Sequence, residues 1–365
     1  MKTYKFAILP SALLLCGTAH AFAPHTYANS ITAHNIAALQ HSITSTAIQS
    51  FDGSISLALP HRQYTSGAPT ISKNTSDQYG RAPMYGTMSI YGEYNDDSRA
   101  GRNGGDTINA DAALNSIWFN WQHLGDDINF NNFENLESDF NTFTMGLAGG
   151  RAKMGNGISE WGIYVGYAGG DHENNNIKIN SHGGYFGVYN GFDWDRFSIS
   201  TTINGGAFSN SADTLFGTDD YSNFWVGGAI NAKYDIILDS QTALRPELHA
   251  GYTWIQSEDY TSASGAIIDN DAFSMFELTP GLRLIRHIGA DWYGSLNAKY
   301  VVFFANGGDM VVNNIKAPEL NETNFFEYSI TIEKSVYNLN ISGNIGRHEG
   351  PRDGWIGGLN IKYIF

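Results

Sequence analysis

The sequence WIGGLNIKYIF (residues 355–365) alternates between two kinds of position. One set of positions includes the polar residues Asn360 and Lys362. The other set is rich in large apolar side chains, namely Trp355, Leu359, Ile361, Tyr363 and Phe365. Because successive side chains of a strand point to opposite faces, this alternation predicts a β-strand with one strongly apolar face.

The same period of two recurs in eleven further segments between residues 114 and 349. The first of them is SIWFNWQH (residues 116–123), whose apolar face consists of Ile117, Phe119 and Trp121. A tilted strand of about 9–11 residues crosses the hydrocarbon layer of a membrane, and outer-membrane barrels have an even number of strands. The pattern therefore predicts an all-β fold, a 12-stranded antiparallel transmembrane β-barrel over residues 114–365.

The composition agrees with a barrel and excludes other classes. Of the 365 residues, 16% are charged, 13% are aromatic and 41 are glycine, which is typical of many strands joined by tight turns. After the N-terminal segment, no run of 18 apolar residues predicts a helical membrane span, whereas a barrel needs only every second residue to be apolar. The net charge of −15 argues against a nucleic-acid partner.

The N-terminus has the pattern of a secretory signal peptide. Lys2 and Lys5 precede the apolar run FAILPSALLLCG, and AHA at 19–21 offers small residues for cleavage before Phe22. We therefore expect residues 1–21 to be removed on export. Cys16, the only cysteine, lies in this segment, so no disulfide stabilises the exported chain.

Residues 22–113 differ from the barrel region in their richness in Pro, Ser, Thr, Asn and Ala. Within NIAALQHSITSTAIQSF the apolar residues recur with a period near 3.6, which predicts a helix at about residues 31–50. GRNGGD (residues 101–106) resembles a linker. Two interpretations remain open for residues 22–113: a short exported passenger with a helix that plugs the pore, or a flexible tether.

The connectors between the predicted strands alternate between long and short. The long ones include residues 124–139, 171–180, 210–220, 255–272 and 305–323, several of them acidic. This alternation predicts that both ends of the barrel domain face the periplasm and that the long loops face outside.

Charged residues recur on the polar faces of the predicted strands. The candidate lumen-lining residues are Lys233, Arg245, Glu247, Glu277, Arg283, Lys299, Glu327, Glu333 and Lys362. They have two interpretations, which sequence cannot separate: a lining that grips a plug helix or filters ions, or a set of cross-barrel pairs that satisfy one another.

No motif predicts catalysis, a metal or a cofactor. The segment RHEGPRDG carries Arg352 where an HExxH motif would have its second histidine, and no GxSxG elbow occurs. His249 lies two residues from Glu247, which makes no catalytic triad. The spacing of the N-terminal histidines fits no metal-ligand pattern; they are His25, His34, His41 and His61.

Six segments occur in a characteristic order and spacing: MGLAGG (145–150), GIYVGYAGG (162–170), GGYFGVYNGFDW (183–194), RPELHAGYTW (245–254), TPGLRL (279–284) and GWIGGLNIKYIF (354–365). Together they resemble the translocator β-domain of autotransporters, the proteins of type V secretion. The resemblance implies a monomeric barrel in the outer membrane of a Gram-negative bacterium, a helix threading its pore, and a passenger carried to the cell surface.

The resemblance also implies partners. Periplasmic chaperones would escort the chain, and the barrel assembly machinery would insert it into lipid by recognising a last strand that ends in an aromatic residue. Trp355, Leu359, Ile361, Tyr363 and Phe365 match that ending.

Two features depart from the family pattern. The region before the barrel is short and has no β-helix repeat, and the only helix candidate directly before the first strand is residues 106–116. We therefore keep two functions open: a barrel that anchors and displays its own N-terminal segment, or a surface adhesin or porin-like barrel that acts through its acidic external loops. An outer-membrane enzyme is a third and weaker hypothesis.

Overall fold

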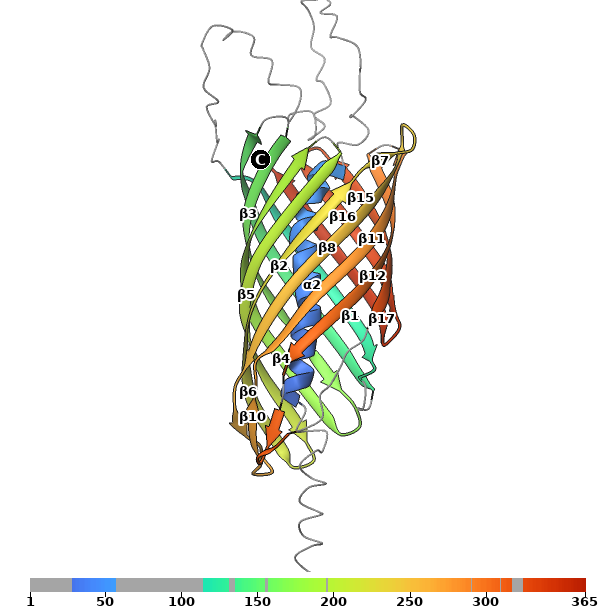
Figure 1. The fold of residues 1–365 in the computed structure, drawn as a ribbon. Helices are drawn as coiled ribbons and strands as arrows, with labels where there is room; N and C mark the ends of the chain where they lie inside the picture. Colours follow the sequence, from blue (N-terminus) through green and yellow to red (C-terminus); the bar gives the residue numbers. More distant parts are fainter. Residues whose placement is uncertain are drawn as a thin grey trace, which may run out of the picture.

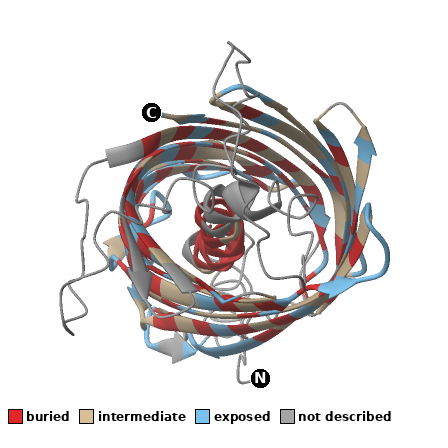
Figure 2. Ribbon diagram, turned by 90° about the horizontal axis from the view of Figure 1, so that it is seen from above, coloured by how far each residue is buried: buried red, intermediate tan, exposed pale blue. Residues whose placement is uncertain are grey.

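The protein is a closed β-barrel with a helix inside it (Figures 1 and 2). The computed structural model describes residues 28–56, 114–130, 135–154, 157–194, 196–289, 291–308, 310–316 and 324–365. The expected signal peptide and residues 57–113 lie outside the described residues. The same is true of residues 106–113 of the second helix candidate, whereas residues 114–116 belong to the first strand.

Twelve antiparallel strands form the barrel wall, which confirms the predicted fold class. In chain order they are β1 (Leu114–Ile128), β2 (Leu136–Met154), β3 (Gly157–Glu173), β4 (Ile177–Trp194), β5 (Phe197–Thr214), β6 (Gly217–Tyr234), β8 (Thr242–Ser257), β11 (Phe273–Gly289), β12 (Trp292–Gly307), β15 (Phe325–Val336), β16 (Leu339–Glu349) and β17 (Arg352–Ile364). Each strand pairs with its neighbours in the chain, and β17 pairs with β1, so the sheet closes on itself.

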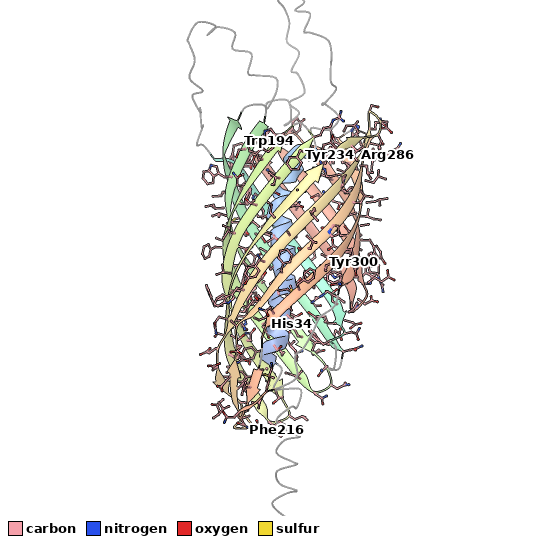
Figure 3. The ribbon with its side chains drawn as sticks, viewed as in Figure 1. His34, Trp194, Phe216, Tyr234, Arg286 and Tyr300 are labelled. Carbon is pink, nitrogen blue, oxygen red and sulfur yellow. The ribbon has the colours of Figure 1, made fainter. Side chains whose placement is uncertain are left out.

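The pairing of β17 with β1 fixes which side chains meet lipid. Ile361 lies opposite Phe119 and Leu359 lies opposite Trp121, so four apolar side chains share the outer face. On the inner face Asn360 lies opposite Asn120. The outward side chains stand on the surface of the barrel, as the sticks in Figure 3 illustrate. No helix among the described residues is long and apolar enough to cross a membrane.

The strands are longer than the sequence predicts, and part of the predicted loop structure is wrong. Residues 171–180 and 210–220 were expected to be long loops, but β3 and β4 extend until only residues 174–176 separate them. Between β5 and β6 only Leu215 and Phe216 remain. The period of two continues in these segments, so the ladder of backbone hydrogen bonds runs on through them as hairpins.

Two other long connectors contain short strands that pair with one another beside the barrel mouth. They are β9 (Tyr260–Thr261), β10 (Ile267–Asn270), β13 (Met310–Val312) and β14 (Ile315–Lys316), which form a four-stranded sheet. A further short strand, β7 (Ile236–Ile237), pairs with β8 at the opposite end.

An apolar cluster lies at the mouth that carries the long loops. Ala28 and Ile31 of the helix pack there against side chains from five hairpins of the wall. Those wall residues are Ile128, Phe130, Leu136, Ile177, Ile179, Ala212, Tyr221, Ile268, Met310 and Val312. The cluster joins the helix to strands that are remote from it in the sequence.

Glycine and aromatic residues interlock on the inner face of β1–β6. The ring of Tyr164 on β3 lies against Gly187 of β4, its partner in the antiparallel ladder. Three other rings lie against glycines in the same way: Trp118 on Gly146, Tyr185 on Gly166 and Tyr189 on Gly162. These positions require glycine because a Cβ atom would collide with the ring.

We predict that Gly187→Val destabilises the barrel, because the added side chain would collide with Tyr164 and Asn204. Overpacking of this kind costs about 1–3 kcal/mol. The midpoint of urea unfolding in detergent measures the loss. Gly184→Val on the same strand is the control, since the nearest atom to its Cβ is the carbonyl oxygen of Gly166 at 3.7 Å. Equal midpoints for the two variants would contradict the interlock.

Candidate functional site: the helix in the barrel lumen

Among the described residues the lumen contains one helix, α2 (Ala28–Ser56), which includes the predicted helix at about residues 31–50 (Figure 2). Its side chains from Ile31 to Thr44 are buried on all sides, polar and apolar alike. The apolar periodicity predicted a helix but did not indicate that its polar side chains would be buried as well. Small residues such as Ala33 and Ala37 allow the helix to pack against the lumen wall.

The direction of α2 follows from its contacts along β1. Ser42 donates a hydrogen bond to Gln122, and Thr46 donates one to Asn120 at 3.4 Å. As the helix proceeds, its partners on β1 come earlier in that strand, so the two elements are antiparallel. Its N-terminal end therefore lies at the mouth with the long loops, and its C-terminal end lies at the mouth where β1 begins (Figure 1).

Polar contacts attach α2 to several parts of the wall. Thr32 Oγ1 lies 2.8 Å from the Tyr221 hydroxyl, and Gln40 Nε2 donates to Asn204 Oδ1 at 2.6 Å. These contacts are made on β6 and β5.

His41 of the helix contacts two glutamates of the wall. Its Nδ1 lies 2.5 Å from Glu277 Oε1 on β11, and its Nε2 lies 3.3 Å from Glu327 Oε2 on β15. Both glutamates are almost fully buried, which is costly for a carboxylate without partners. The histidine ring therefore bridges two strands of the wall and fixes the depth of the helix in the barrel.

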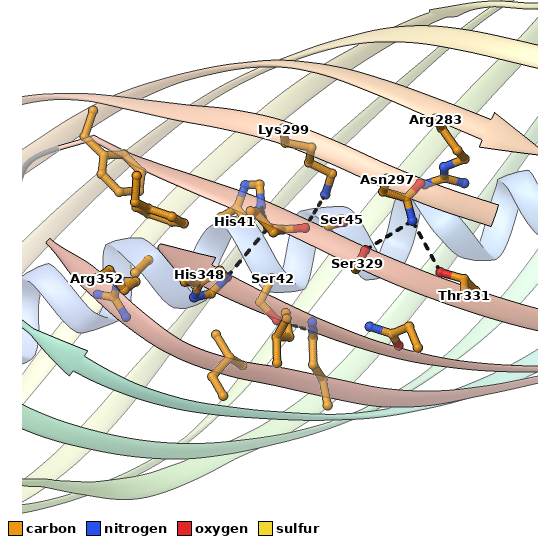
Figure 4. A pocket seen from close by; sticks show the side chains of 18 residues that line it. His41, Ser42, Ser45, Arg283, Asn297, Lys299, Ser329, Thr331, His348 and Arg352 are labelled. Atoms are coloured by element: carbon orange, nitrogen blue, oxygen red, sulfur yellow. Dashed lines mark hydrogen bonds and ion pairs between the residues drawn. The ribbon is translucent and has the colours of Figure 1, made fainter. Parts of the chain in front are cut away.

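Each of these glutamates has a further partner from the wall. Thr279 donates to Glu277 at 2.6 Å, and Lys299 Nζ donates to Glu327 at 2.9 Å. Lys299 and His41 both line a cavity of about 30 Å³, where Figure 4 shows them near each other. Each glutamate therefore has one partner from the wall and one from the helix.

A second network lies nearer the long-loop mouth. Asp126 on β1 accepts a hydrogen bond from Arg352 at 2.9 Å and lies 2.9 Å from His348 Nδ1. Arg352 also approaches Asn35 of the helix at 3.5 Å. The seam between β1 and β17 is therefore reinforced by side chains as well as by backbone pairing.

The predicted lumen-lining residues all lie on the inner side of the wall, where none is exposed. Glu277 and Glu327 contact the helix, and Lys299 pairs with Glu327. Arg245 pairs with Asp235 at 2.6 Å, Arg283 with Glu247 at 3.2 Å, and Lys362 with Glu160 at 3.6 Å. Lys233 is 5% exposed, and Glu333 is partly buried. Some members of the set therefore contact the helix, whereas others form ion pairs with residues of the wall.

Sequence reasoning missed several members of the site. His41 lay in the predicted helix, but no local pattern links it to glutamates that are 236 and 286 residues away. Asp126 stood in a predicted loop, although the structure places it in β1. Gln122 lies on the face of SIWFNWQH opposite Phe119 and Trp121, which was the one signal that could have marked it.

The residues of the proposed C-terminal signal lie on the outer face of β17. Trp355 is 55% exposed, Tyr363 is 44% exposed and Phe365 is 66% exposed. Leu359 and Ile361 continue the same outward row.

A family model of the autotransporter beta-domain matches residues 116–350. The chain belongs to the autotransporter family. As an autotransporter translocator barrel it lies in the outer membrane of a Gram-negative bacterium. A comparison with curated protein sequences finds no match.

Solved autotransporter barrels have the same fold. The chain is similar to the transport unit of AIDA-I from Escherichia coli, with a TM-score of 0.60, 15% identity, and coverage of 73% of this chain and 94% of that one. It is also similar to the beta domain of the Bordetella autotransporter Brka (TM-score 0.58, 14% identity, coverage 69% and 100%). The translocator domain of NalP from Neisseria meningitidis gives a TM-score of 0.55 at 14% identity, with coverage of 70% and 90%.

We predict that His41→Leu loosens the helix of this autotransporter barrel. Removing the imidazole leaves Glu277 and Glu327 with fewer partners inside the lumen, and breaking a buried charged network costs about 3–5 kcal/mol. The expected results are a lower urea midpoint and a higher single-channel conductance in planar bilayers, because the helix leaves the lumen more often.

Thr44→Val is the matched control, since the Thr44 hydroxyl donates to the helix carbonyls of Gln40 and His41. We expect its conductance to equal that of the unmodified protein. A His41→Leu barrel with unchanged midpoint and conductance would contradict the role assigned to this histidine.

Proposed function

We propose that this autotransporter barrel anchors in the outer membrane and displays its own N-terminal segment at the cell surface, with α2 held in the pore. The observation that carries the proposal is the direction of the helix. Its N-terminal end packs into the apolar cluster at the long-loop mouth. In outer-membrane barrels the long loops face outside, so a segment that precedes Ala28 would leave the barrel on the cell surface.

The direction of α2 also implies on which side of the membrane residues 57–113 lie under this proposal. They connect the C-terminal end of α2 to the beginning of β1, and both of these ends lie at the mouth with the short turns. A connection that starts and ends at one mouth needs no passage through the lumen. On this proposal the displayed segment consists of the residues between the cleaved signal peptide and α2, and residues 57–113 face the periplasm.

We predict that two epitope tags in this chain respond oppositely to antibody. A tag after Phe22 should be reached on intact cells, because the residues before α2 leave the barrel at the long-loop mouth. A tag after Gly104 should be reached only when the outer membrane is permeabilised. Immunofluorescence on intact and permeabilised cells is the measurement.

The pattern of results separates the candidate functions. A Phe22 tag that needs permeabilisation would contradict display and would favour the adhesin or porin-like barrel, which acts through its external loops. A Gly104 tag reached on intact cells would overturn the periplasmic placement of residues 57–113. An untagged strain gives the background for both.

We also propose that β17 carries the insertion signal for the barrel assembly machinery, after delivery of a monomeric chain by periplasmic chaperones. Its outward row ends in Tyr363 and Phe365, whose rings contact each other with centroids 5.6 Å apart. This exposed aromatic end is the feature a recognition partner could bind before the barrel closes.

We predict that Phe365→Ala slows insertion without destabilising the folded barrel. The Phe365 ring is 66% exposed on the outside, so it makes little packing contact within the folded protein. The fraction of heat-modifiable protein in the outer membrane, followed over time by gel, measures insertion. Phe304→Ala is the matched control, with an outward ring that is 56% exposed on β12. Equal insertion rates for the two variants would argue against a terminal signal.

A further inference from the structure

Three metal-ligating side chains from separate elements converge in the lumen. They are His41 of α2, His249 of β8 and Glu277 of β11, and one ligand atom from each lies within 4.8 Å of the others. His41 Nδ1 lies 2.5 Å from Glu277 Oε1, and His249 Nε2 lies 3.8 Å from the same oxygen. The two imidazole rings meet edge to face with centroids 5.5 Å apart.

His249 has an unused polar atom that points into this cluster. Its Nε2 is buried and has no hydrogen-bond partner among the described residues, and the residue as a whole is 8% exposed. The 3.8 Å separation from Glu277 is too long for a hydrogen bond. A buried nitrogen without a partner costs free energy, so a ligand that occupies this position would be favoured.

The donor set suits a zinc-class ion. Zn²⁺ binds imidazole nitrogens and carboxylate oxygens at about 2.0–2.2 Å, so two ligands of one tetrahedral ion lie roughly 3.3 Å apart. The separations from Glu277 Oε1, 2.5 Å to His41 and 3.8 Å to His249, lie on either side of that value. The three ligand atoms lie within 4.8 Å of one another, so rotations of all three side chains would bring them to the required separations.

Space for a fourth ligand is present beside the cluster. A cavity of about 30 Å³ is lined by His41, His249 and Thr279 among other residues, which is enough for a water molecule. Two histidines, one glutamate and one water is a ligand set that zinc uses in proteins.

The charged residues around the cluster decide which carboxylate is available to a cation. Lys233, Arg283 and Lys299 line the same cavity, together with Glu247, and Glu327 lies on the far side of His41. Lys299 and Arg283 already pair with Glu327 and Glu247. Glu277 is thus the carboxylate left for a cation, and the ion would lie between Glu277 and the two histidines.

We propose that His41, His249 and Glu277 bind a divalent transition-metal ion of the zinc class, which ties the lumen helix to β8 and β11. Spacing in the sequence could not indicate this site, because its three ligands come from elements that meet only inside the closed barrel. Bound metal would hold the helix at a fixed depth and so stabilise the plugged barrel. The proposal stands whether or not the N-terminal segment is displayed.

Isothermal titration of the folded, untagged barrel in detergent with ZnCl₂ tests the site. We expect one saturable site per barrel and a higher thermal unfolding temperature with Zn²⁺ than with EDTA. His249→Ala should weaken Zn²⁺ binding at least tenfold and abolish the thermal shift. Because His249→Ala also removes a buried ring that lies against His41, the thermal shift is taken as the difference between Zn²⁺ and EDTA for the same variant.

His182→Ala is the control for surface binding, since His182 is exposed on β4, away from the cluster. It should keep both the binding and the thermal shift. The proposal is overturned if no saturable binding occurs, if His249→Ala binds Zn²⁺ as tightly as the unmodified barrel, or if His182→Ala removes the binding. Glu277→Gln provides a second ligand variant, in which binding should again weaken at least tenfold.

Discussion

The pairing of β17 with β1 is the interaction on which the rest of the structure depends. In lipid every backbone N–H and C=O must find a partner within the protein, and only a closed sheet leaves no edge. Closure also fixes the register, because a slip of one residue would turn every side chain of a strand to the other face. Lys362 would then lie in lipid and Tyr363 in the lumen. Closure of the ring therefore requires the register in which the alternating apolar side chains face lipid and the polar ones face the lumen.

Closure creates a lumen that the wall alone does not fill. An eight-stranded barrel is just narrow enough for its own side chains to fill, whereas twelve strands enclose more space. In this chain α2 takes that space, and the wall is built to receive it in two different ways. On β1–β6 aromatic rings lie on glycines of the inner face, beside amide side chains such as Asn120 and Asn204 that bond the helix. On β8–β17 ionisable side chains form networks that the helix enters through His41.

The polar character of the helix follows from this asymmetric lumen. A buried carboxylate needs partners, and Glu277 and Glu327 obtain one of theirs from the helix. Gln40 Nε2 and the Ser42 hydroxyl each donate to an amide side chain of the wall, which offsets part of the cost of burying them. The helix is thus a structural part of the barrel interior. Its N-terminal end lies at the long-loop mouth, and its C-terminal end lies at the mouth where β1 begins.

The sequence by itself determined the barrel, because the period of two is a local property that each strand carries independently of its partners. The twelve strands, the outward row from Trp355 to Phe365 and the inward position of charges such as Arg245 and Lys299 all follow from it. The tertiary structure alone decided the length of the hairpins, the direction of α2 and the partners of His41. Those features depend on contacts between residues far apart in the chain, and such residues become neighbours only when the ring closes around the helix.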